Sequence, residues 1–398
     1  MLRVEMLCTG DEVLHGQIID TNAAWLADYL FQQGLPMTSR MTVGDDLDAL
    51  VTAITQRSQI ADVLIVNGGL GPTSDDLSAL AAATAAGEAL VEHAEWLVRM
   101  EAFFTERGRI MAPSNRKQAQ IPASAEMVDN PVGTACGFAL QLNQCLMFFT
   151  PGVPSEFKVM VEQQIMPRLR DRFAIAEPPL CLRLTTFGRS ESDLASQLDG
   201  ETLPPGVVLG YRSSMPIIEL KLTGPAAQRT AMEQLWEQVR IVAGENIIFE
   251  GTEGLPAQLA RRLAERELQL AVSEDFTAGL LNWQLQSASV PLAGGELRVN
   301  GDDSQNLQQF AQETRQLAER HNAQLALRVG ARYDDRLVIA LHTPQGTFAQ
   351  AIQYNVQRYS LRTHQEVVAM LAMNMLRRWL NGWSVYGGHG WITVLTTL

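Results

Sequence analysis

A glycine-rich run between a predicted strand and a predicted helix constrains this chain more than any other feature. The run covers residues 67–76 and reads NGGLGPTSDD. It follows the hydrophobic stretch 61–66, which is typical of a buried strand, and precedes an alanine-rich stretch from about Leu77, which is typical of a helix. A strand, a turn and a helix in this order predict an α/β sheet with the run at the carboxyl end of a strand.

The composition of the run suits a phosphate ligand. Glycine lets the backbone approach a ligand and point successive N–H groups at it, while hydroxyl and carboxylate groups nearby suit a hard cation. We therefore predict a phosphate or diphosphate site, although a plain turn is the alternative. The run lacks the Gly-Lys-Ser/Thr of a Walker A loop and the G-x-G-x-x-G spacing of a dinucleotide fingerprint. The candidate contacts are Gly68, Gly69, Gly71, Thr73, Asp75 and Asp76.

Composition excludes several classes of protein. The chain has 398 residues, of which 46% are hydrophobic and 19% charged, as expected for a soluble protein of two or three domains. Its first residues do not resemble a signal peptide, and no stretch of about 18 apolar residues predicts a membrane span, so we expect a cytoplasmic protein. A net charge of −13 argues against nucleic acid as a partner. The four cysteines form no C-x-x-C pair and are predicted to be buried, reduced thiols.

The alternation of strand-like and helix-like segments predicts three domains. Residues 1–172 have the pattern of a parallel sheet covered by helices on both faces. Residues 173–252 form a small α+β unit, which a Pro-Pro pair at 178–179 precedes. Residues 253–398 form another α/β domain, with a long polar helix predicted over 303–322.

Other polar clusters in the first domain are predicted to meet the glycine-rich run. Segments 9–12 and 43–46 each follow a predicted strand, and segment 20–22 opens a helix. Loops beyond the carboxyl ends of parallel strands line one crevice, so Asp11, Asp20, Asn22 and Asp45 should face the same ligand. Asp20 also has the position of an ordinary helix N-cap, as does either Asp45 or Asp46, and this alternative stays open.

Three later segments add candidates. Arg116, in the turn 115–118, could supply charge to a ligand phosphate, or it could simply lie in solvent. The glycine-containing turn 130–137 supplies Gly133 and Thr134, which could close over a ligand. Glu156, at the start of a helix after 151–155, could contact a metal ion or favour the helix dipole.

At this point the chain resembles a known family. The segments TGDEVLHGQIIDTNAAWLA, TVGDD, NGGLGPTSDD, NRKQAQIPASA, NPVGTACG and FFTPGVPSEF, in this order, resemble the N-terminal domain of the competence/damage-inducible CinA family. That domain is similar in fold to the molybdopterin-binding proteins of cofactor biosynthesis. Residues 186–192 resemble the small KH-like middle region of full-length CinA proteins, and residues 253–398 resemble their C-terminal domain only faintly.

The resemblance implies two activities. The N-terminal domain of the family is associated with metal-dependent hydrolysis of ADP-ribose, and the C-terminal domain with deamidation of nicotinamide mononucleotide. It implies catalytic roles for Asp75, Asp76 and Asp45, metal contacts for Asp76 and Glu156, and a divalent cation such as Mg²⁺, Mn²⁺ or Co²⁺. A homodimer that binds a nucleotide such as ADP-ribose is expected. The alternatives are a pterin-binding protein and a non-catalytic interaction protein in competence or DNA-damage response.

The C-terminal domain departs from the family pattern where the deamidase chemistry lies. The family motif Ala-Glu-Ser-Cys-Thr-Gly-Gly corresponds to SEDFTAG at 273–279, so serine and cysteine are replaced by Asp275 and Phe276. The family's Tyr-Ser-Asn-Glu-x-Lys element has no counterpart in 294–301, and no lysine follows Lys221. Its Gly-Ile-Ala-Gly-Pro loop corresponds to VGARYD at 329–334. We therefore predict a degenerate deamidase domain with a structural role.

Overall fold

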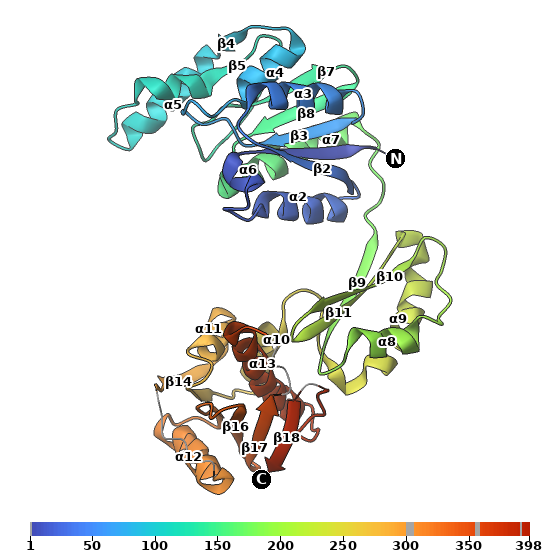
Figure 1. Ribbon diagram of the computed structural model, residues 1–398, viewed down its shortest axis with the longest axis vertical. Coiled ribbons are helices and arrows are strands. Elements are labelled where there is room, and N and C mark those ends of the chain that lie inside the picture. Colours follow the sequence, from blue (N-terminus) through green and yellow to red (C-terminus); the bar gives the residue numbers. More distant parts are fainter. Residues whose placement is uncertain (1, 300–305, 355–358, 391) are drawn as a thin grey trace. The chain divides into compact units, whose positions relative to one another are not determined.

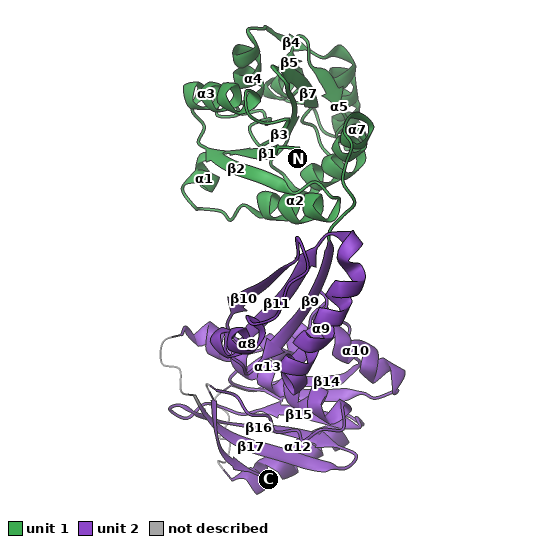
Figure 2. Ribbon diagram, turned by 90° about the vertical axis from the view of Figure 1, so that its right-hand side faces the viewer, with its two compact units in different colours: residues 1–179 green, residues 180–398 purple. Residues whose placement is uncertain are grey.

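The computed structural model describes residues 2–299, 306–354, 359–390 and 392–398. The chain divides into two compact units, residues 1–179 and 180–398 (Figures 1 and 2). Two sequence predictions extend outside the described residues: 300–301 of the segment compared with the family's lysine-containing element, and 303–305 of the predicted polar helix.

The first unit is built on a mixed six-stranded sheet. Its first four strands are parallel, whereas β7 and β6 are antiparallel to their neighbours. The purely parallel sheet expected from the sequence is therefore extended by an antiparallel edge. A tight turn explains it, because Asn143, at φ 54°, takes the positive φ that short hairpins need between β7 and β8. The strand order is β2 (Met37–Val43), β1 (Val4–Thr9), β3 (Val63–Asn67), β8 (Cys145–Thr150), β7 (Gly137–Leu142) and β6 (Glu126–Val128).

Helices cover both faces of this sheet, as the sequence predicts. Every residue of β1 and β3 is buried, which is characteristic of strands packed on both sides. One hydrophobic core lies between the sheet and α2 (Thr21–Gln32), α6 (Pro154–Met160) and α7 (Met166–Arg172). The other lies against α3 (Leu47–Ser58), α4 (Ser78–Ala86) and α5 (Ala94–Glu106). Shorter elements complete the unit: α1 (Asp11–Leu14), β4 (Leu90–Glu92), η1 (Pro113–Ala119), β5 (Gln120–Pro122) and η2 (Val161–Ile165).

The second unit begins with a four-stranded antiparallel sheet. Along β11 every second residue is buried against α8 (Glu191–Leu198) and α9 (Arg229–Ala243), which matches the period of a strand covered on one face. Strand β12, which the sequence did not predict, adds the edge next to β9. The strand order is β10 (Val208–Ser214), β11 (Ile217–Gly224), β9 (Leu180–Phe187) and β12 (Ile247–Glu250), and the short turns are η3 (Ala226–Gln228) and η4 (Gly244–Asn246).

A second six-stranded sheet completes this unit. One face packs against α10 (Leu255–Glu265), α11 (Leu280–Ser287) and α13 (Leu361–Leu380), and the other against α12 (Leu307–Arg320) (Figure 1). The sequence predicted neither α11 nor the edge strands β14 and β18. The strand order is β14 (Leu292–Leu297), β13 (Leu270–Glu274), β15 (Leu325–Val329), β16 (Arg336–Thr343), β17 (Gly346–Tyr354) and β18 (Ile392–Thr397).

The two sheets of the second unit share one core. Phe187 of β9 and Ile248 of β12 lie in the same hydrophobic cluster as the buried residues of α10 and α13. Arg377 of α13, only 4% exposed, donates hydrogen bonds to the carbonyls of Glu245 (2.7 Å) and Ile247 (2.6 Å). We call Arg377 and its partners the arginine clamp. The predicted domain boundary at 252/253 thus falls inside one compact unit.

The cysteines are unpaired, and three of the four are buried. Burial raises the pKa of both Cys136 and Cys145 to about 12, so these thiols stay protonated at neutral pH. Cys181 is an exception to the predicted burial, because it lies on the partly exposed face of β9.

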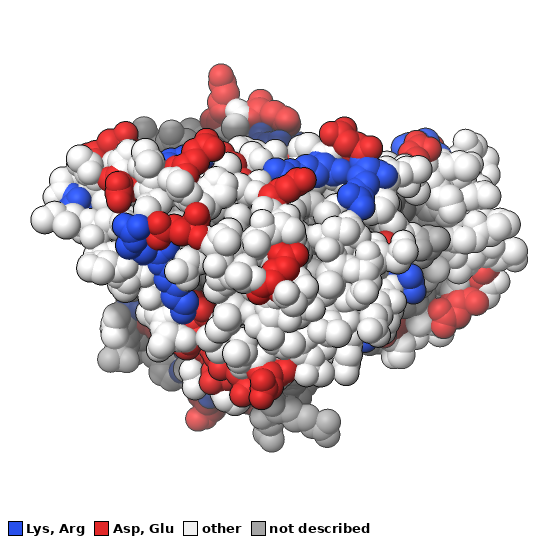
Figure 3. All heavy atoms as spheres, turned by 90° about the horizontal axis from the view of Figure 1, so that it is seen from above, with Lys and Arg blue, Asp and Glu red and all other residues white. Residues whose placement is uncertain are grey.

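Two expectations from the sequence concern membrane spans and basic surfaces. Every helix among the described residues is too short or too polar to cross a bilayer. On the face drawn in Figure 3, the arginine and lysine side chains described there are interspersed with aspartate and glutamate and form no continuous basic surface.

Candidate functional site

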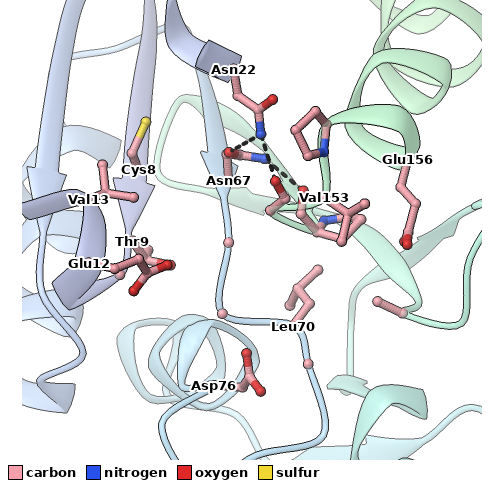
Figure 4. A pocket seen from close by; sticks show the side chains of 18 of the residues that line it. Cys8, Thr9, Glu12, Val13, Asn22, Asn67, Leu70, Asp76, Val153 and Glu156 are labelled. Carbon is pink, nitrogen blue, oxygen red and sulfur yellow. Dashed lines mark hydrogen bonds between the residues drawn. The ribbon is translucent and has the colours of Figure 1, made fainter. Parts of the chain in front are cut away.

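A pocket of about 520 Å³ lies at the carboxyl ends of β1, β3 and β8 in the first unit (Figure 4). The loops that follow these strands line it, as the topology of a parallel sheet predicts. Thr9, Glu12, Asn67 and Gln118 also line the pocket and were not among the predicted contacts. The predicted residues that do line it are Asp20, Asn22, Asp45, Gly68, Gly69, Gly71, Asp75, Asp76, Thr134 and Glu156.

The glycine loop, residues 67–76, takes a shape that only glycine allows at two positions. Gly68 and Gly69 have φ values of 108° and 67°. Ser78, at the start of α4, fixes the loop, because its hydroxyl donates to the Gly68 carbonyl (2.7 Å) and its N–H to the Gly69 carbonyl (3.1 Å). A Cβ at Gly68 would lie 2.7 Å from the Thr9 hydroxyl, and one at Gly69 would collide with Ser78 Oγ. The glycines are thus required by the protein's own packing.

We therefore expect Gly69→Ala to destabilise the first unit by about 2–4 kcal/mol, from backbone strain together with the forced contact at Ser78. Gly87→Ala is the matched control, because Gly87 has φ 69° and open space around its Cβ position. That change should cost only about 1 kcal/mol. Hydrogen exchange of the buried amides of β3 measures both effects. Equal losses in the two variants would show that Ser78 does not restrict the loop.

Thr73 binds the Asp76 carboxylate and does not line the pocket. The Asp76 Oδ2 atom accepts hydrogen bonds from the N–H (2.8 Å) and the hydroxyl (2.5 Å) of Thr73. Lys117 Nζ donates to the Thr73 carbonyl, which ties the loop to η1. Thr73, predicted to contact the ligand, is consequently absent from the pocket lining, whereas Asp76 lines it. Its contribution is to hold the Asp76 carboxylate at the pocket wall.

Arg116 also lies away from the pocket. Its guanidinium forms two hydrogen bonds with the Glu92 carboxylate, at 2.7 and 3.2 Å, and it does not line the cavity. The neighbouring Lys117 is the residue of η1 that reaches the glycine loop. Sequence alone does not show which of two adjacent cations a 3₁₀ turn directs toward the loop.

The acidic side of the pocket is centred on Asp45. Asp11 N–H donates to Asp45 Oδ2 (3.1 Å), and Asp45 N–H donates to Asp11 Oδ1 (3.2 Å). Asp11 therefore orients Asp45 but does not itself line the pocket. Partial burial raises the pKa of Asp45 above its usual value, and repulsion from the carboxylates of Asp11, Glu12 and Asp75 adds to the rise. Asp46, not Asp45, caps α3 through the Ala49 N–H (2.8 Å).

Asparagine side chains connect β3, α2 and the loop after β8. Asn22 Nδ2 donates to Asn67 Oδ1 (3.0 Å) and to the Gly152 carbonyl (2.8 Å), and Asn67 Nδ2 donates to the Pro151 carbonyl (2.7 Å) (Figure 4). Asp20 caps α2 by accepting from the Ala23 N–H (2.8 Å). Both the capping role and the pocket position of segment 20–22 are therefore realised. Asn67 directly precedes the glycines, and this position was the available signal for it.

Glu156 is held against the turn 130–137. The buried Asn130 donates to Glu156 Oε2 (2.7 Å) and accepts the Gly133 N–H (3.1 Å). Any side chain at Gly133 would collide with the Glu156 carboxylate, so Gly133 permits this approach without lining the pocket. The Thr134 hydroxyl donates to Gln118 Oε1 (3.2 Å), and the Thr134 carbonyl accepts from Trp96 Nε1 (3.0 Å).

The pocket supplies oxygen ligands suited to a hard divalent cation, but not a complete metal site. Carboxylates of Glu12, Asp20, Asp45, Asp75, Asp76 and Glu156 line it. The described residues nevertheless contain no group of three or more His, Cys, Asp or Glu side chains that could hold a metal ion. Mg²⁺ is usually bound by one or two carboxylates together with water and substrate phosphates. The donor set therefore fits a cation that binds together with a phosphate ligand.

Comparison with known proteins places this architecture in a family. Residues 5–171 match the family model described as a probable molybdopterin binding domain. A CinA-like protein of Escherichia coli strain 55989 / EAEC is 64% identical over 401 residues, which span 100% of this chain and 99% of that protein. This chain belongs to the CinA-like proteins. A relative from Escherichia coli K12 with the same identity and coverage is called NMN amidohydrolase-like protein YfaY.

Two solved structures are also similar to this CinA-like chain. The protein CinA from Thermoplasma acidophilum is 28% identical, with a TM-score of 0.38, over 43% of this chain and 96% of that one. The molybdopterin biosynthesis enzyme MoaB from Thermus thermophilus is 17% identical, with a TM-score of 0.31, over 43% of this chain and 94% of that one.

In this CinA-like chain, the segment compared with the deamidase motif has become part of the core. The Glu274 carboxylate, 1% exposed, accepts hydrogen bonds from the Thr277 hydroxyl (2.5 Å) and from the N–H groups of Leu281 (3.1 Å) and Asn282 (2.9 Å). Thr277 is equally buried, and Phe276 packs into the hydrophobic cluster of α10, α11 and α13. Glu274 and Thr277 therefore stabilise the amino end of α11.

Proposed function

We propose that the first unit binds an ADP-ribose-like nucleotide and hydrolyses its diphosphate with a divalent cation, giving AMP and ribose 5-phosphate. The observation that supports this most is the convergence of the glycine loop and six carboxylates on one pocket of about 520 Å³. This volume falls in the range of about 300–1,000 Å³ that is usual for ligand sites.

Each side of the pocket has a role in this reaction. Backbone N–H groups of the glycine loop bind the phosphate oxygens, and Asp76, held by Thr73, faces them. Asp45, whose pKa is raised by partial burial and further by its acidic surroundings, is the group proposed to accept a proton from the attacking water. The water oxygen bonds to one phosphorus while the bridging P–O bond breaks. A cation held by Asp76 and Glu156 would neutralise phosphate charge and lower the pKa of that water.

The test is incubation of the purified full-length protein with ADP-ribose and Mg²⁺, Mn²⁺ or Co²⁺, with AMP and ribose 5-phosphate quantified by chromatography. We expect turnover with at least one cation, and a loss of about 10²–10³-fold in kcat for Asp76→Ala. The control is Asp48→Ala, which removes an exposed carboxylate from the first turn of α3, outside the pocket. Thr73→Val, which leaves the Asp76 carboxylate in place, should reduce kcat less than Asp76→Ala.

Absence of AMP with all three cations would refute hydrolysis. Binding of ADP-ribose without turnover, measured by calorimetry, would then favour the non-catalytic interaction protein. The match of residues 5–171 to a probable molybdopterin binding domain supports a second candidate, a pterin-binding protein. A thermal-shift comparison of molybdopterin precursors with ADP-ribose distinguishes these ligands, because only the true ligand should raise the melting temperature markedly.

A further inference from the structure

Two buried oxygen atoms of pocket residues lack a hydrogen-bond partner. They are Thr9 Oγ1 and Asn22 Oδ1. Each residue is only 6% exposed, and both line the pocket. A buried polar atom without a hydrogen-bond partner is unfavourable for folding. Such atoms are therefore rare in proteins unless water or a ligand supplies the missing partner.

The orientation of the Asn22 amide is fixed by its neighbours. Its nitrogen donates to two acceptors, Asn67 Oδ1 (3.0 Å) and the Gly152 carbonyl (2.8 Å). Turning the amide over would place its oxygen against both of these oxygens. In Figure 4 the Asn22 nitrogen accordingly faces Asn67, and the oxygen is directed to the other side. Asn22 Oδ1 therefore acts only as an acceptor, and its missing partner must carry a hydrogen-bond donor.

Thr9 lies on the other side of the strand ends, beside the glycine loop. It is the last residue of β1, and because side chains alternate along a strand, it points to the opposite face of the sheet from Cys8. A Cβ at Gly68 would lie 2.7 Å from the Thr9 hydroxyl, which places this hydroxyl next to the loop backbone. A hydroxyl can donate a hydrogen bond, so Thr9 can bind a phosphate oxygen together with the N–H groups of the loop.

We propose that the pocket binds its ligand in one direction, with a phosphate oxygen at Thr9 and a neutral hydrogen-bond donor, either a sugar hydroxyl or an N–H group of the base, at Asn22. An ionised phosphate offers only hydrogen-bond acceptors, so it cannot supply the donor that Asn22 Oδ1 lacks. The phosphate therefore binds on the side of Thr9 and the glycine loop. This proposal rests on the proposed function only in requiring a ligand that combines a phosphate with such a donor.

The first test uses Thr9. Thr9→Val removes a hydroxyl that has no partner in the free protein, so the melting temperature without ligand should be unchanged or higher. The same change should lower the affinity for ADP-ribose and for pyrophosphate by about tenfold each, as measured by metal-free calorimetry. It should leave binding of adenosine, which has no phosphate, unchanged. Thr9→Ser keeps the hydroxyl and should retain affinity close to that of the wild type.

The second test uses Asn22→Ala. We expect weaker binding of ADP-ribose and adenosine, but not of pyrophosphate. 2′,3′-Dideoxyadenosine identifies the donor. If Asn22→Ala weakens its binding as much as that of adenosine, the donor is on the base, and if it does not, the donor is a ribose hydroxyl. Because Asn22→Ala also removes two internal hydrogen bonds, its folding is checked by circular dichroism, and the Thr9 series stands independently of it.

Three results would overturn the proposal. A large fall in the melting temperature of ligand-free Thr9→Val would mean that the hydroxyl has a structural partner. Unchanged ADP-ribose and pyrophosphate affinity in the same variant would mean that Thr9 is not a phosphate contact. Equal losses of affinity for adenosine and pyrophosphate in Asn22→Ala would contradict the proposed direction of binding. Failure of the wild type to bind ADP-ribose both with and without a divalent cation would instead refute the proposed function.

Discussion

We expect the purified full-length protein to release no ammonia from nicotinamide mononucleotide above the uncatalysed rate. Amide hydrolysis by this type of site needs an activated hydroxyl and a group that takes its proton. The two hydroxyl side chains of the segment 273–279, Ser273 and Thr277, are 2% and 1% exposed, and Thr277 donates its hydrogen bond to Glu274. No lysine follows Lys221 in the sequence, so an activating amine is lacking throughout the domain.

The measurement is a coupled ammonia assay with the mononucleotide, alongside a lysine-containing deamidase as a positive control. Restoring Asp275→Ser and Phe276→Cys together should not produce activity, because the proton acceptor would still be missing. Ammonia release by the wild type that is lost in Asp275→Ala or Thr277→Ala would contradict this expectation. Such a result would mean that an aspartate or the buried threonine performs the chemistry.

The second large effect concerns the arginine clamp. Arg377→Leu should lower the free energy of unfolding of the second unit by about 3–5 kcal/mol, because it removes a side chain that is only 4% exposed and leaves the carbonyls of Glu245 and Ile247 without their part-buried donors. It also removes the contact of the guanidinium with the Trp383 ring, whose centroid lies 5.4 Å away. Urea denaturation followed by tryptophan fluorescence gives the value.

Arg362→Leu is the control on the same helix. Its side chain is 84% exposed and, within the described part of the chain, pairs with Glu366, four residues along α13, so the loss should be about 0–1 kcal/mol. The clamp would be energetically unimportant if the two variants unfolded at the same urea concentration. A further check is the exchange of β12 amides, which should become faster in Arg377→Leu alone.

Sequence periodicity was sufficient where a segment is long and its hydrophobic pattern is regular. The small α+β unit predicted after the Pro-Pro pair is present, and along its strand at 217–224 burial alternates from one residue to the next as the pattern requires. Strand β14 was missed because its sequence, LAGGEL, contains two glycines, which usually indicate a turn. In the fold a Cβ at Gly294 would collide with His321 and one at Gly295 with Asn282, so the packing of neighbours makes glycine suitable for this strand.

The candidate site shows the same limit. The strand-turn-helix order located the pocket, because the carboxyl ends of parallel strands necessarily share one edge. The order did not reveal that Thr73 is engaged by Asp76, or that Arg116 is engaged by Glu92, since these pairings depend on contacts within and between loops. Nor did it single out Thr9, whose interest lies in a missing partner, a property that exists only once the chain is folded.

The core shared by the two sheets of the second unit bears on how such a protein can change over evolutionary time. Phe187 and Ile248 would face water if residues 253–398 were deleted, and the carbonyls of Glu245 and Ile247 would lose Arg377. The segment 253–398 therefore supports the fold of the preceding sheet, whether or not it catalyses a reaction. Its chemical residues are free to drift, as Asp275 and Phe276 illustrate, while the polypeptide that carries them has to be retained.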